Sequence, residues 1–100
     1  MDERVVILLV DDEPSILQSL KRVFRGEPYE VIVAESGARG LEQFAEGIPV
    51  RAVISDYRMP GMNGVEFLRK VYEQSPETVR IDLFTLVREM LTHGLVDLET

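Results

Sequence analysis

The sequence contains no cysteine and no tryptophan, and its only lysines are Lys21 and Lys70. Without cysteine, disulfide bonds and thiolate metal sites are excluded, and a reducing compartment such as the cytoplasm is permitted. No apolar run is long enough to cross a membrane. No signal peptide precedes the strand-like run that begins at Arg4. We therefore expect a cytoplasmic protein that makes no contact with a membrane.

Positive charge is also scarce, since 11 Lys and Arg residues stand against 18 Asp and Glu residues, for a net charge of -7. Nucleic-acid phosphates are bound by clustered Lys and Arg, so we expect no direct nucleic-acid partner. The 100 residues, 45% of them hydrophobic, are enough for a single domain with one core. An acidic surplus by itself indicates only solubility, so the positions of the carboxylates decide whether they form a site.

Short apolar runs alternate with one-sided apolar helices through most of the chain. The pattern predicts strands over 4–10, 29–34 and 50–54, each followed by a helix. Ser36 and Asn63 are suitable N-caps for the second and third helices. Strands that are apolar throughout, with helices between them, predict an α/β fold with a doubly wound parallel sheet covered on both faces.

Three carboxylates follow two of these strands at the point where each strand ends. Asp11 and Asp12 follow the first strand, and Asp56 follows the third. The carboxyl ends of parallel strands share the edge where open α/β sheets bind ligands, so the three converge if these strands are neighbours. Like charges about 4 Å apart repel by roughly 1 kcal/mol in bulk water and about 4 kcal/mol at an effective dielectric of 20. The cluster therefore favours a bound cation, for which Mg²⁺ is suited, with proton sharing as the alternative.

Two stretches resemble the receiver domain of two-component response regulators. They are Leu8-Leu9-Val10-Asp11-Asp12-Glu13 and Asp56-Tyr57-Arg58-Met59-Pro60-Gly61-Met62-Asn63-Gly64. The resemblance covers 4–81 and leaves 82–100 as an atypical tail of the same single domain, 1–100. It implies a flavodoxin-like (CheY-like) sheet of strand order 2-1-3-4, with the family's fifth strand missing, in a bacterial signalling protein.

The resemblance also implies a role for each residue of the acidic cluster. Asp56 would be the phosphoacceptor, taking a phosphoryl group from a histidine kinase, a phosphotransfer protein or a small acyl phosphate. Asp12 would bind Mg²⁺ directly and Asp11 mainly through water, while Asp56 and the backbone carbonyl of Arg58 would complete the ligands. Such a module is no turnover enzyme and signals to an output domain or effector protein. The Met59-Pro60 and Asn63-Gly64 positions would shape the loop rather than react, with Gly64 serving tight packing or a special dihedral angle.

Receivers also place a Ser or Thr at the end of the fourth strand and a Lys at the end of the fifth, and this chain has no candidate for the Lys. Its tail admits three interpretations. A strand over 79–85, followed by a helix, would make Thr85 the hydroxyl; a long helix capped by Ser75 would form one apolar stripe; a later strand end would use Thr92. We favour the strand that ends at Thr85, although it places Asp82 in mid-strand, where burial without a partner is costly.

The sequence leaves alternative functions open. A degenerate receiver, acting as a protein-interaction or dimerisation module without productive phosphorylation, is favoured by the missing Lys and opposed by the complete acidic cluster. A Mg²⁺-dependent phosphohydrolase would need an Asp-x-Asp motif where the sequence reads Asp11-Asp12-Glu13. A sheet without its last strand also predicts self-association or completion by a larger protein.

Overall fold

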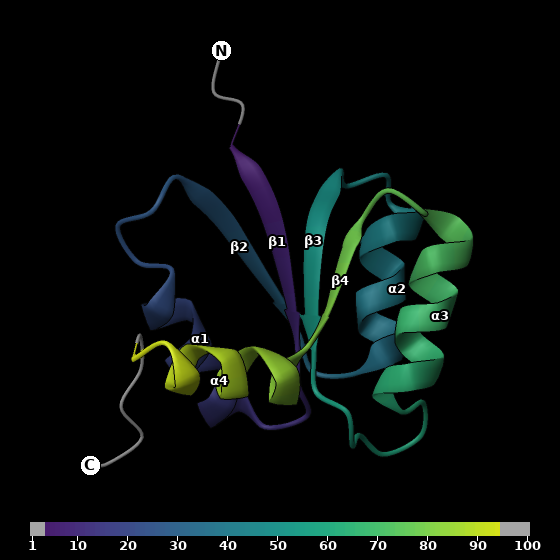
Figure 1. Ribbon diagram of the computed structural model, residues 1–100. Coiled ribbons are helices and arrows are strands. Elements are labelled where there is room, and N and C mark those ends of the chain that lie inside the picture. Colours follow the sequence, from purple (N-terminus) through teal and green to yellow (C-terminus); the bar gives the residue numbers. More distant parts are fainter. Residues whose placement is uncertain (1–3, 95–100) are drawn as a thin grey trace.

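The computed structural model describes residues 4–94, along which strands and helices alternate (Figure 1). The elements are β1 (Val5–Val10), α1 (Pro14–Val23), β2 (Tyr29–Ala34), α2 (Gly37–Ala45), β3 (Val50–Ser55), α3 (Gly64–Gln74), β4 (Val79–Asp82) and α4 (Leu83–Thr92). The first three predicted strands are confirmed to within one residue at each end. None of the helices in this range is long and apolar enough to span a lipid bilayer.

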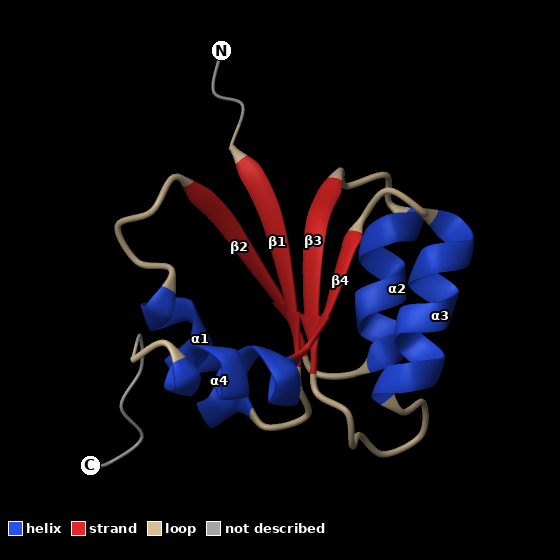
Figure 2. Cartoon of the chain, in the orientation of Figure 1, coloured by secondary structure: helices blue, strands red, loops and turns tan. Residues whose placement is uncertain are grey.

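Four parallel strands form one sheet in the order β2-β1-β3-β4 (Figure 2). Strand β1 is central, and its last residue, Val10, lies beside Ala34 of β2 and Ser55 of β3. The doubly wound α/β sheet with strand order 2-1-3-4 is therefore confirmed. Because β1 and β3 are neighbours, the residues that follow them are brought to the same edge of the sheet.

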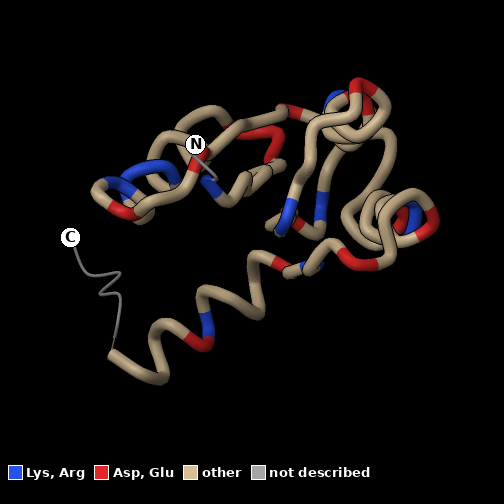
Figure 3. Tube along the Cα trace, turned by 90° about the horizontal axis from the view of Figure 1, so that it is seen from above, with Lys and Arg blue, Asp and Glu red and all other residues tan. Residues whose placement is uncertain are grey.

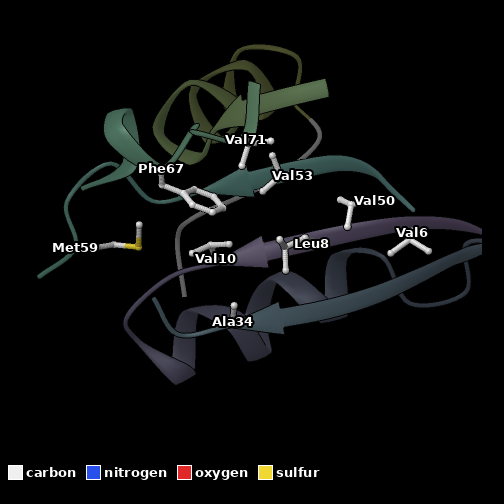
Figure 4. Packing of buried hydrophobic residues seen from close by; sticks show 9 residues of the cluster. All are labelled: Val6, Leu8, Val10, Ala34, Val50, Val53, Met59, Phe67 and Val71. Atoms are coloured by element: carbon white, nitrogen blue, oxygen red, sulfur yellow. The ribbon is translucent and has the colours of Figure 1, made fainter. Parts of the chain in front are cut away.

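Helices α2 and α3 cover one face of the sheet, and α1 and α4 cover the other. On the first face Phe67 is fully buried in the larger core layer, toward the end where Met59 lies (Figure 4). The members of this layer are Val6, Leu8, Val10, Ala34, Val50, Val53, Met59, Phe67 and Val71. The second face has a smaller buried layer of Ile7, Leu9, Leu17 and Ile54.

Helix α4 packs more loosely than the other helices. Leu83 and Leu86 are partly buried against the second core layer, but no residue from Leu83 to Thr92 is fully buried. Seen from above, α4 runs along one side of the chain, apart from α2 and α3 (Figure 3). Phe84 keeps 71% of its surface exposed. The helix therefore leaves apolar surface in contact with solvent.

The predicted caps of α2 and α3 are confirmed. The Ser36 hydroxyl oxygen accepts a hydrogen bond from the Arg39 N–H (3.1 Å), and Asn63 Oδ1 accepts one from the Glu66 N–H (2.9 Å). Each cap satisfies a backbone donor that has no partner within its helix. The Asn63 cap fixes where α3 begins and so sets the end of the loop that starts at Asp56.

The fourth strand is shorter than predicted, because β4 ends at Asp82 and α4 begins at Leu83. The strand over 79–85 is therefore wrong in its last three residues. Asp82 Oδ1 accepts hydrogen bonds from the backbone N–H groups of Phe84 (2.7 Å) and Thr85 (3.3 Å), which makes it the N-cap of α4. A carboxylate that would be costly within a parallel strand is stabilised by these donors at a helix N-terminus.

The other two interpretations of the tail are also wrong in their secondary structure. A continuous helix from Ser75 is excluded because residues 79–82 pair with β3. Thr92 is the last residue of α4 rather than a strand end, and its hydroxyl donates to the Arg88 carbonyl oxygen (2.8 Å). Between residues 4 and 94 the sheet has four strands, with β4 at one edge.

Candidate functional site

Asp11 is held at the carboxyl end of β1 by its own backbone and side chain. Its N–H donates to the Ala34 carbonyl oxygen (3.1 Å), and its Oδ1 accepts from the Glu13 N–H (2.9 Å). The residue is only 3% exposed, whereas the neighbouring Asp12 is half-buried. The end of β1 therefore presents one buried and one more accessible carboxylate.

Asp56 is placed beside this pair by the pairing of β1 with β3. Its N–H donates to the Val10 carbonyl oxygen (2.9 Å), and its Oδ1 accepts from the Tyr57 N–H (2.8 Å). One carboxylate oxygen each from Asp11, Asp12 and Asp56 lies within 4.8 Å of the others. The three carboxylates thus converge as the parallel sheet predicts, while their roles stay predictions.

Burial raises the pKa of Asp11 from 3.8 to about 6. The hydrogen bond from the Glu13 N–H opposes this rise, and the negative charges of Asp56 and Asp12 add to it. The cluster therefore holds a proton more readily than three separate carboxylates would. A hard divalent cation bound among the same oxygens would displace that proton, so the donor set fits Mg²⁺.

The raised pKa of Asp11 predicts a pH-dependent contribution to stability. Folded Asp11 keeps its proton up to about pH 6, whereas the unfolded chain releases it near 3.8. Between these values the folded state binds more protons than the unfolded chain. The cost of ionising Asp11 in the folded state is therefore largest above about pH 6, and it shrinks as the pH falls from about 6 to about 4. Without Mg²⁺, Asp11→Asn should raise the free energy of unfolding at pH 7 by about 1 kcal/mol, after allowance for solvent screening.

Urea unfolding without Mg²⁺ measures this gain at pH 7 and again at about pH 4.5, where it should shrink. The Asn side chain retains an oxygen that can accept from the Glu13 N–H. Glu46→Gln, at the exposed end of α2, removes the same charge far from the cluster and should have little effect. A gain of equal size at both pH values would contradict the assignment of the proton to Asp11.

The loop after Asp56 is held close to the start of α3. The Gly64 N–H donates to the Tyr57 carbonyl oxygen (2.9 Å), and Met59 is buried. A Cβ on Gly64 would lie 2.9 Å from the Tyr57 Cα and closer still to the Asp56 carbonyl oxygen. Its φ is not positive, so of the two predicted reasons for a glycine here, tight packing is confirmed and a special dihedral angle is wrong.

A pocket of about 650 Å³ lies beside Asp56, lined by Asp56, Tyr57, Arg58, Asp82 and Phe84. Asp56 and Arg58 are predicted site residues, whereas nothing in the sequence predicts Asp82 and Phe84 as pocket residues. An Asp before an apolar stripe is a possible helix N-cap, but the residues around Asp82 fit a strand as well, so this signal alone does not mark the junction.

Neither Thr85 nor a lysine lines this pocket. Thr85 is exposed in the first turn of α4 and is not among the five lining residues. Lys21 lies in α1 and Lys70 in α3, so neither lysine stands at a strand end. The predicted place of Thr85 at the end of the fourth strand is thus wrong, and its role toward a phosphoryl group stays a prediction.

Comparison with known proteins gives consistent matches over most of the chain. A sequence model of the response regulator receiver domain matches residues 7–96, past the position where the motif resemblance ends. The chain is 38% identical over 80 residues to the hydrogenase transcriptional regulatory protein HoxA of Cupriavidus necator, which is 80% of this chain and 16% of that protein. It is 36% identical over 86 residues to the two-component response regulator ARR17 of Arabidopsis thaliana, covering 75% of this chain and 56% of that protein.

Among solved structures, the signal receiver domain of an HD domain-containing protein from Pseudomonas fluorescens Pf-5 is similar, with a TM-score of 0.76 and 30% identity. The match covers 94% of this chain and 78% of that one. The chain spans less than two thirds of the length of either HoxA or ARR17.

Proposed function

The chain belongs to the family of response regulator receiver domains, and from that premise we propose that it accepts a phosphoryl group on Asp56 in a Mg²⁺-dependent reaction. The observation that carries the proposal is the convergence of three carboxylates within 4.8 Å at the carboxyl edge of the sheet. Receiver domains are signalling modules rather than turnover enzymes. Intact mass after incubation with acetyl phosphate, with and without Mg²⁺, tests the proposal.

In the proposed reaction, an Asp56 carboxylate oxygen attacks the phosphorus of a phosphohistidine or of an acyl phosphate. A P–O bond to Asp56 forms, the bond from phosphorus to the donor breaks, and the donor leaves with its electron pair. Asp12 would bind Mg²⁺ directly and Asp11 through water, with Asp56 and the Arg58 carbonyl oxygen as further ligands. The bound ion would neutralise charge on the transferring group.

The partners proposed are a histidine kinase or phosphotransfer protein as the donor, and an output domain or effector protein as the recipient of the signal. HoxA is named a transcriptional regulatory protein and is much longer than this chain, which supports an output that lies elsewhere. The location of the protein in a bacterial cytoplasm stays a prediction, since the similar protein ARR17 belongs to a plant. A second candidate, an interaction module without productive phosphorylation, is supported by the absence of lysine from the strand ends described between residues 4 and 94.

Self-association is proposed through the edge strand β4. Within residues 4–94, β4 pairs only with β3, and Val79 is 53% exposed. Antiparallel pairing of two copies about a two-fold axis at Ile81 would set Arg80 of each copy opposite Asp82 of the other. Opposite charges directly across an antiparallel pair are stabilising, so the edge is complementary to itself.

Arg80→Glu is expected to weaken this dimer about tenfold, because it sets like charges opposite each other at two places. Sedimentation velocity over a concentration series measures the effect. Arg69→Glu, an equal charge reversal on the exposed side of α3, should leave the dimer unchanged. A wild-type chain that stays monomeric at the highest concentration would refute pairing between copies.

A further inference from the structure

Asp82 lies on one side of Asp56, and Asp11 and Asp12 lie on the other. In the pairing of β3 with β4, Asp82 is the register partner of Ser55, the residue before Asp56. The strand order β1-β3-β4 puts Asp11 and Asp12 on one flank of Asp56 and Asp82 on the other. Asp56 and Asp82 line the same pocket.

The carboxylate of Asp82 is fixed in this position. Its Oδ1 accepts from the backbone N–H groups of Phe84 and Thr85, and the residue is half-buried. These two hydrogen bonds hold the carboxylate at the amino end of α4. Among the described residues, the group with oxygens within 4.8 Å of one another comprises Asp11, Asp12 and Asp56, so Asp82 would not be a ligand of a cation held there.

We propose that Asp82 slows phosphoryl transfer to Asp56 by electrostatic repulsion. This inference rests on the proposed function. A phosphoryl donor entering the pocket brings negative charge beside a fixed carboxylate, which accepts hydrogen bonds and donates none when ionised. The resemblance places a hydroxyl, a neutral donor, at the end of this strand in receivers. Arg58 lines the same pocket, but its side chain is exposed and its charge is screened by solvent.

Two variants remove the charge and keep the helix cap. In Asp82→Asn and Asp82→Ser a side-chain oxygen can still accept from the N–H groups of α4, since Asn, Asp and Ser are comparable N-caps. With acetyl phosphate, the phosphoryl group is transferred to Asp56. Acetate leaves with the electron pair of the P–O bond that breaks, so the step needs no other reactant. With excess Mg²⁺, the initial rate of phosphoryl uptake should rise about tenfold in Asp82→Asn.

An electrostatic cause can be recognised from its salt dependence. The ratio of the uptake rate of Asp82→Asn to that of the wild type should fall as ionic strength rises. Glu77→Gln makes the same change in net charge just before the amino end of β4, at the opposite edge of the sheet, and should leave the rate unchanged. Circular dichroism and thermal melts check that each variant is folded.

Asp82→Ser should be at least as fast as Asp82→Asn, because its hydroxyl can donate to a phosphoryl oxygen. A wild-type chain that is phosphorylated on Asp56 but is not slower than folded Asp82→Asn and Asp82→Ser would overturn this inference alone. Absence of labelling in the wild type and in both variants would overturn the proposed function, and the inference with it.

Discussion

Asp56→Asn is expected to abolish Mg²⁺-dependent phosphorylation of the chain. The amide of Asn lacks the negatively charged oxygen that attacks phosphorus, so the amount of phosphoprotein formed from acetyl phosphate should fall by about a hundredfold or more. The local backbone contact can be kept, because the Asn oxygen can still accept a hydrogen bond from the Tyr57 N–H, as Asp56 Oδ1 does at 2.8 Å. Intact mass, compared with and without Mg²⁺, measures the loss.

Glu35→Gln is the matched control for this substitution. Glu35 follows β2 at the same edge of the sheet, is exposed, and is not part of the acidic cluster, so its variant should take up phosphoryl groups as the wild type does. A mass gain that persists in Asp56→Asn would transfer the acceptor role to another residue. A wild type that gains no mass while it still binds Mg²⁺ would favour the interaction module.

The site could be predicted from the sequence because two simple patterns place it. Runs that are apolar throughout mark strands buried on both faces, and a parallel sheet carries all their carboxyl ends to one edge. Asp11, Asp12 and Asp56 each follow such a run, so their convergence required only that β1 and β3 be neighbours. The caps at Ser36 and Asn63 were equally local, since each depends on a side chain and an N–H three residues later.

The junction of β4 and α4 could not be predicted in the same way. No Gly, Pro or Asn separates them, and apolar residues at 79, 81, 83 and 84 fit strand and helix about equally well. The boundary depends on whether the strand continues past Asp82 or Asp82 accepts hydrogen bonds from the N–H groups of a following helix. That choice is made by tertiary structure, because pairing with β3 ends at Ser55 and leaves the next turn free to become helical.

Gly64→Ala is expected to destabilise the fold and disturb the site together. The added Cβ would meet the Asp56 carbonyl oxygen and the Tyr57 Cα, which are backbone atoms and cannot rotate away. Helix α3 or the loop after Asp56 must therefore move, and we expect the free energy of unfolding to fall by about 3 kcal/mol. The Gly64 N–H bond to the Tyr57 carbonyl oxygen joins the same two segments, so phosphoryl uptake by the folded fraction should also slow.

Gly37→Ala separates this clash from the general effect of adding a methyl group. Gly37 is likewise the first residue of a helix and has no positive φ, but its Cβ would meet first the Met62 Sδ, at 3.0 Å, which belongs to a flexible side chain. Because Ala favours helix and Met can move, its free energy of unfolding should change by less than about 1 kcal/mol. Urea unfolding of both variants measures the difference. Equal stability of Gly64→Ala and the wild type would show that the start of α3 does not hold the Asp56 loop in place, and the position of Asp56 would then depend on β3 alone.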